Sequence, residues 1–82
     1  MLKREFIAEV NKQKEEGLKI DLIKLVNNTS KLDYVESKKV IEGCFGFSNL
    51  QDSLKTGKEL YDTLMAYPNA KENIKEYKLK NN

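Results

Sequence analysis

Apolar residues recur at helical spacing from the start of the chain. The first group falls on one side of a helix with about 3.6 residues per turn: Leu2, Phe6, Ile7 and Val10. A polar tail follows and ends at Gly17, a suitable residue for the left-handed position after a helix. The pattern predicts a first helix over about residues 2–16.

The next segment has two alternative interpretations. Apolar residues within 18–22 alternate as in a strand, whereas those within 22–26 have helical spacing. Asp21 is a suitable N-cap. We therefore predict a helix over roughly 21–28, stopped by the polar residues that follow, with a strand over 18–26 as the alternative.

A third helix follows, and two capping patterns compete for its start. Ser30 with Asp33, or Asp33 with Glu36, pairs a short polar side chain with an acid three residues later. Gly46 can end this helix in a left-handed cap. Ser37 lies one turn before its apolar face, which comprises Val40, Ile41, Cys44 and Phe45.

A fourth helix carries the most extended apolar stripe. We predict that it starts at Ser48, with Gln51 in the capping-box position. The stripe has a 4-3-4-3 spacing: Leu50, Leu54, Gly57, Tyr61 and Leu64. A glycine within such a stripe marks close approach of another helix or a break. Leu54 is expected in the core, so Leu54→Asp should lower stability, because burying a leucine is worth roughly 1.5–3 kcal/mol.

Pro68 should end the fourth helix, since proline disfavours a helical conformation in the residue before it. Asn69 with Glu72 resembles another cap, which would open a last helix to about Tyr77.

Together these segments predict an all-α fold, a compact single domain of four to five short helices over residues 1–82, with 79–82 frayed. A length of 82 residues leaves no room for two domains. The content of 39% hydrophobic residues supports a core. No apolar run approaches the roughly 18–20 residues of a membrane span, and the charged start differs from a signal peptide, so no membrane partner is expected.

The residue inventory predicts a protein that is not an enzyme. Histidine is missing, which removes the usual proton shuttle and the commonest metal ligand. The glycines form no phosphate-binding loop. We expect no catalytic, cofactor-binding or metal-binding residues and no cofactor. The single cysteine, Cys44, favours a reducing, cytoplasmic setting and is expected to be a small buried apolar residue.

Nucleic-acid binding is the alternative function. Residues 21–45 are predicted to form a helix, a short turn and a helix, as in helix-turn-helix proteins, although any small helical domain contains such corners. Its second helix would present Tyr34, Lys38 and Lys39. The net charge of +2 is spread evenly along the chain, which does not favour a phosphate-binding stripe.

Residues 21–58 resemble the helical half of the histone-like HU/IHF family. The resemblance rests on Asp21-Leu22-Ile23-x-x-Val26, Thr29-Ser30-x-Leu32, Ser37-Lys38-Lys39, Phe45 and Leu54-Lys55-x-Gly57. Two extra residues precede the last motif, Gly46 interrupts a helix that is continuous in the family, and no DNA-binding β-arm follows. The first 20 residues also have no counterpart in the family. The resemblance implies a helical, dimerisation-like core without DNA-binding equipment, and no family site residue is carried over.

The favoured function is a small non-enzymatic protein-binding module: an inhibitor, adaptor or regulator of a larger host or viral protein. Phe47 follows a glycine hinge, and the stripe over 50–64 could fill a groove or meet a second copy in a homodimer. Abundant lysine and asparagine would suit a phage or mobile-element gene. The candidate partner-binding residues are Phe47, Leu50, Leu54, Tyr61 and Tyr67.

Overall fold

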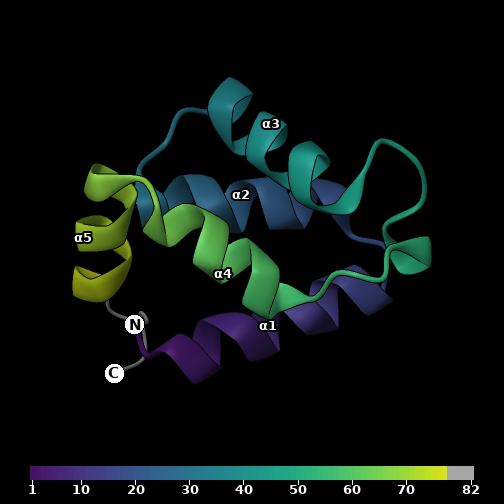
Figure 1. The fold of residues 1–82 in the computed structure, drawn as a ribbon, viewed down its shortest axis with the longest axis horizontal. Helices are drawn as coiled ribbons and strands as arrows, with labels where there is room; N and C mark the ends of the chain where they lie inside the picture. Colours follow the sequence, from purple (N-terminus) through teal and green to yellow (C-terminus); the bar gives the residue numbers. More distant parts are fainter. Residues whose placement is uncertain (78–82) are drawn as a thin grey trace.

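The computed structural model describes residues 1–77, which form helices joined by loops and contain no strand. Its elements are α1 (Lys3–Glu15), α2 (Lys19–Ser30), α3 (Tyr34–Phe45), the short 3-10 helix η1 (Leu50–Asp52), α4 (Gly57–Met65) and α5 (Pro68–Glu76) (Figure 1). The predicted all-α single domain is confirmed. The strand alternative for 18–26 is wrong, because α2 covers that segment. The predicted fraying of 79–82 concerns residues outside the described part.

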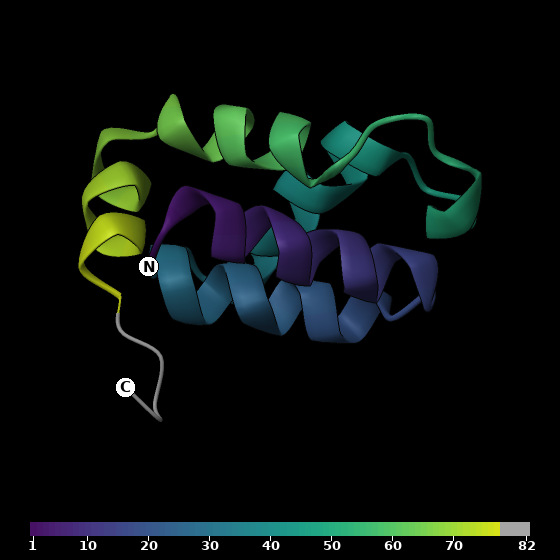
Figure 2. The ribbon, with the colours of Figure 1, turned by 90° about the horizontal axis from the view of Figure 1, so that it is seen from below.

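Helices α1 to α4 form an irregular bundle that α5 closes at one end. Helix α1 packs against α4 and α2, and α3 packs against the other sides of α2 and α4. Figure 2 shows α5 standing across the end of the bundle where the chain starts. There it contacts α2 and α4. The amino group of Met1 donates hydrogen bonds to the last carbonyls of α5, including those of Ile74 (3.1 Å) and Lys75 (3.2 Å).

One hydrophobic core fills the space between the helices. Each helix contributes at least one side chain with no more than 1% of its surface exposed, for example Phe6, Leu22, Ile41, Leu60 and Ile74. The amphipathic spacing in the sequence thus identified the buried face of most helices correctly.

Helix α1 ends as predicted, with Gly17 in the left-handed region at φ 70°. Helix α2 differs from its prediction at both ends. Leu18 is its N-cap and Asp21 lies inside its first turn, so the predicted Asp21 cap is wrong. The polar run expected to stop α2 continues it, and the hydroxyls of Thr29 and Ser30 donate to backbone carbonyls one turn earlier.

Helix α3 follows the second of the two predicted capping patterns. The side chain of Asp33 accepts a hydrogen bond from the Glu36 backbone N–H at 2.8 Å. Its expected apolar face is buried, apart from Cys44, which is partly covered. Gly46 ends the helix at φ 91° and ψ 177°, a positive φ in an extended conformation where a left-handed helical cap had been expected.

The predicted continuous helix from Ser48 is wrong. Asn49 caps η1, the chain is extended at Ser53, and α4 starts at Gly57. Thr56 and Glu59 form a capping box at this second start. This box satisfies free backbone N–H groups that a continuous helix would have bonded internally, so the stripe divides into two parts. Leu54 lies between them with 98% of its surface exposed, and its predicted core position is also wrong.

Pro68 follows the end of α4 and is itself the first residue of α5. Its fixed φ suits that position, where a missing N–H costs no helical hydrogen bond. Tyr67 is therefore the N-cap, and the predicted cap of Asn69 with Glu72 is wrong. Helix α5 is tied to the end of α2 instead, because Asn73 Nδ2 donates to the Ser30 carbonyl at 2.9 Å.

Candidate protein-binding surface

The candidate partner-binding residues do not form one surface. Phe47 and Leu54 are 81% and 98% exposed, whereas Leu50 is 3% exposed and belongs to the core. Tyr61 and Tyr67 are both half-buried. Of the predicted set, only Phe47 and Leu54 present large apolar side chains fully to solvent.

Phe47 and Leu54 share one segment, which we call the connector: residues 46–56, between α3 and α4. The connector is fixed at its middle, where Leu50 enters the core. Next to it, Gln51 Nε2 donates to the Glu15 carbonyl at the end of α1, at 2.6 Å. With this point anchored, the residues on either side of η1 turn their side chains outward.

The Tyr61 side chain makes its contacts within the fold. Its ring packs edge-on against Phe6, with centroids 5.8 Å apart, and the Lys3 ammonium lies 5.4 Å from its centroid. Both contacts hold the Tyr61 side chain of α4 against α1. Tyr61 therefore covers the edge of the core, and its place in the apolar stripe did not distinguish this role from that of an interface tyrosine.

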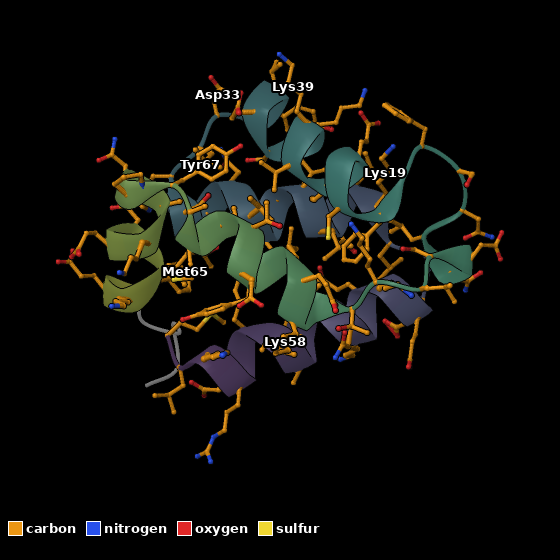
Figure 3. The ribbon with its side chains drawn as sticks, viewed as in Figure 1. Lys19, Asp33, Lys39, Lys58, Met65 and Tyr67 are labelled. Atoms are coloured by element: carbon orange, nitrogen blue, oxygen red, sulfur yellow. The ribbon has the colours of Figure 1, made fainter. Side chains whose placement is uncertain are left out.

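A groove of about 270 Å³ runs between α3 and α4, and the linear sequence did not reveal it. Tyr67 points from the end of α4 towards α3 (Figure 3). The lining residues come from both helices, the connector and the junction between α4 and α5: Lys39, Val40, Gly43, Cys44, Lys55, Thr63 and Tyr67.

The two charged residues of this lining are Lys39 and Lys55. Within residues 1–77, neither ammonium lies within 4 Å of a carboxylate oxygen. Two carboxylates on the helices that flank the groove have other partners. Glu42 pairs with Lys19 at 2.6 Å, and Asp62 pairs with Lys58 at 3.4 Å.

Within residues 1–77, the carboxylate of Glu59 is held by hydrogen bonds instead of an ion pair. It accepts hydrogen bonds from the Thr56 hydroxyl at 2.6 Å and the Thr56 N–H at 2.7 Å. These bonds, the hydroxyl first, lower the pKa of Glu59 below its ordinary value. The Glu59 carboxylate is thus held ionised at the start of α4, whereas the groove lining itself contains two lysines and no acidic residue.

Cys44 lines the groove and is only partly buried, where a buried position had been expected. Burial raises the pKa of its thiol, and the nearby Lys55 opposes this effect only in part. The thiol is therefore protonated at neutral pH, which is unlike an activated nucleophile.

The residues of the nucleic-acid alternative lie on one helix. Tyr34, Lys38 and Lys39 are all exposed on α3. The Lys19–Glu42 ion pair joins the start of α2 to the end of α3, so the two helices meet at these ends, while α3 lies inclined to α2 (Figure 3). In a helix-turn-helix unit the two helices cross at roughly 90–120°, which would separate these ends.

The described part of the chain, residues 1–77, contains no group of three His, Cys, Asp or Glu residues placed to hold a metal ion. None of its helices combines the length and apolar character that crossing a bilayer requires. Compared with known proteins, the chain matches no family model, no curated protein and no solved structure.

Proposed function

We propose that this protein is a small non-enzymatic protein-binding module, an inhibitor, adaptor or regulator that docks on a larger host or viral protein through its connector. One observation carries the proposal. Within the described part, the two most exposed large apolar side chains, Phe47 and Leu54, lie on this one segment. Exposed apolar residues grouped on an otherwise well-packed small domain are typical of interaction sites.

The energetics suit an anchor role. Burying a leucine or phenylalanine side chain is worth roughly 1.5–3 kcal/mol, so a partner that covers both gains about 3–6 kcal/mol before the costs of association. The anchored position of η1 limits how far the connector must be ordered on binding. A cytoplasmic setting belongs to this proposal, because the free Cys44 thiol suits a reducing compartment.

The test is an affinity capture from lysate of the source cells with three versions of the full chain. The Phe47→Ser/Leu54→Ser variant should lose the captured protein, while a control variant, Ile20→Ser/Val35→Ser, should retain it. The control residues are also exposed apolar side chains, 53% and 61%, on other elements. Equal capture by all three versions would exclude the connector as the docking site.

Nucleic-acid binding remains the second candidate, supported by the shared exposure of Tyr34, Lys38 and Lys39 on α3. Phosphate-driven binding should weaken steeply between about 50 and 200 mM salt, whereas an apolar interface should change little. Nuclease treatment of one half of each capture separates the two functions. The HU/IHF resemblance and a homodimer through 50–64 stay predictions; sedimentation of the purified chain tests the second.

A further inference from the structure

We infer that the groove between α3 and α4 is the docking site for an acidic segment of the partner protein, in which carboxylates alternate with apolar side chains. The inference rests on the proposed function, because it names the chemistry of the same partner. It adds a second contact surface beside the connector.

The floor of the groove suits apolar side chains. Val40 is 5% exposed and forms its base together with Cys44 and the Tyr67 ring. The rim is open at Gly43, where an added Cβ would meet no atom within 4 Å. A volume of about 270 Å³ is near the lower limit for small-molecule pockets, and it accommodates a few side chains of a peptide.

The charge of the groove selects the polar part of the ligand. Lys39 and Lys55 are the two charged residues of the lining, which contains no acid, and neither has an ion-pair partner within residues 1–77. Carboxylates of a partner would supply the missing negative charge. Such complementarity raises the association rate and excludes basic competitors.

The groove is also continuous with the connector. Lys55 lines the groove and follows Leu54 directly in the chain, so their Cα atoms are about 3.8 Å apart. One extended segment can therefore contact the exposed Leu54 and continue between α3 and α4.

Nucleic acid fits this groove less well than an acidic peptide. Single-stranded nucleic acid is bound by a positive path along several phosphates and by exposed aromatic rings for stacking. The groove offers two ammonium groups, and its one aromatic residue, Tyr67, is half-buried.

The experiment selects binders of the full chain from a library of random peptides of about 12 residues, which span about 40 Å when extended. We expect enriched sequences that combine Asp or Glu with apolar residues. Lys39→Glu/Lys55→Glu should weaken the selected peptides about tenfold or more, because like charges then face each other. The control variant Lys12→Glu/Lys24→Glu reverses the charge of two exposed lysines of α1 and α2. It should leave the affinity for the peptides within about twofold.

Two further readouts locate the binding. Bound peptide should slow alkylation of the Cys44 thiol, which lies on the groove floor. Gly43→Leu should also abolish binding, because its side chain would occupy the open rim without changing charge. Circular dichroism of each variant shows that the fold is kept.

The inference is overturned if no peptides are selected, if they lack acidic residues, if both charge variants bind them equally, or if Cys44 stays equally reactive. Its failure is separable from failure of the proposed function. A cellular partner that is lost with Phe47→Ser/Leu54→Ser but retained by Lys39→Glu/Lys55→Glu would support the connector and exclude the groove.

Discussion

Gly57 is the position where one added methyl group should weaken the packing of α1 against α4. It is the first residue of α4, and its N–H donates to Asn11 Oδ1 of α1 at 2.7 Å. A Cβ at this position would lie 2.7 Å from the Ile7 carbonyl oxygen and 3.1 Å from Val10 Cβ. The nearest of these atoms is backbone inside a helix, which cannot rotate away. Gly57→Ala therefore forces α1 and α4 apart.

Two opposing effects set the size of the change. Overpacking of this kind costs typically about 1–3 kcal/mol. Alanine returns up to about 1 kcal/mol through its better helix propensity, and less at a first helical position. The net expectation is a loss of about 1–2 kcal/mol. For a domain of this size that lowers the Tm by about 4–16 °C.

Gly43 provides the matched control, since it lies in the middle of α3 with open space around the added Cβ. There the same substitution should stabilise by about 0.5–1 kcal/mol. Urea unfolding followed by circular dichroism measures both variants against the parent chain. If Gly57→Ala unfolds at the same or higher urea concentration as Gly43→Ala, the close approach of α1 and α4 does not exist in solution.

Three further predictions concern single side chains. Leu54→Asp should change the free energy of unfolding by less than about 0.5 kcal/mol, whereas Leu60→Ala should cost about 2–5 kcal/mol; equal effects in chemical denaturation would contradict the exposure of Leu54. Thr56→Ala should cost about 1 kcal/mol through its lost cap, and it should remove part of the acid sensitivity of the fold. Because folding lowers the pKa of Glu59, its carboxylate stabilises the fold above the unfolded pKa, and this stabilisation is lost as pH falls through the folded pKa. If the urea midpoints of the parent chain and of Thr56→Ala change with pH in parallel, this linkage is contradicted. Asn73→Ala should cost about 1 kcal/mol by releasing α5 from the end of α2, and thermal melts with no shift would show that the bond is unimportant.

The sequence predicted helices best where local signals agreed. Over α1 and α3, apolar spacing and a terminal glycine indicate the same boundaries, and α3 also has a polar start. Asp33 as the cap of α3 follows from its own side chain, which bonds three residues ahead without help from the rest of the fold. Such contacts are local and are therefore encoded in neighbouring residues.

The start of α4 was mispredicted because two capping signals lie close together in the chain. Ser48 with Gln51 and Thr56 with Glu59 both match the capping pattern, and the apolar stripe runs through both. The choice depends on Gly57, which fits against the Ile7 carbonyl only where α4 begins beside α1. That contact joins segments about fifty residues apart, so no local pattern contains it.

The candidate site shows the same division. The sequence analysis named Phe47 and Leu54 as partner candidates, and the structure exposes both, although the same analysis placed Leu54 in the core for the question of stability. It could not show the groove, because that surface exists only when Cys44 of α3 and Tyr67 after α4 are brought together.

The sequence by itself therefore determined the helical class, the approximate position of each helix and which side of it can be buried. Hydrophobic spacing carries this information because a helix repeats regularly along one chain. Only the tertiary structure determined which apolar residues are buried against another element. Leu50 was covered by α1 and the core, and Leu54 was not. Burial belongs to a pair of surfaces, and a pattern along one segment describes only one of them.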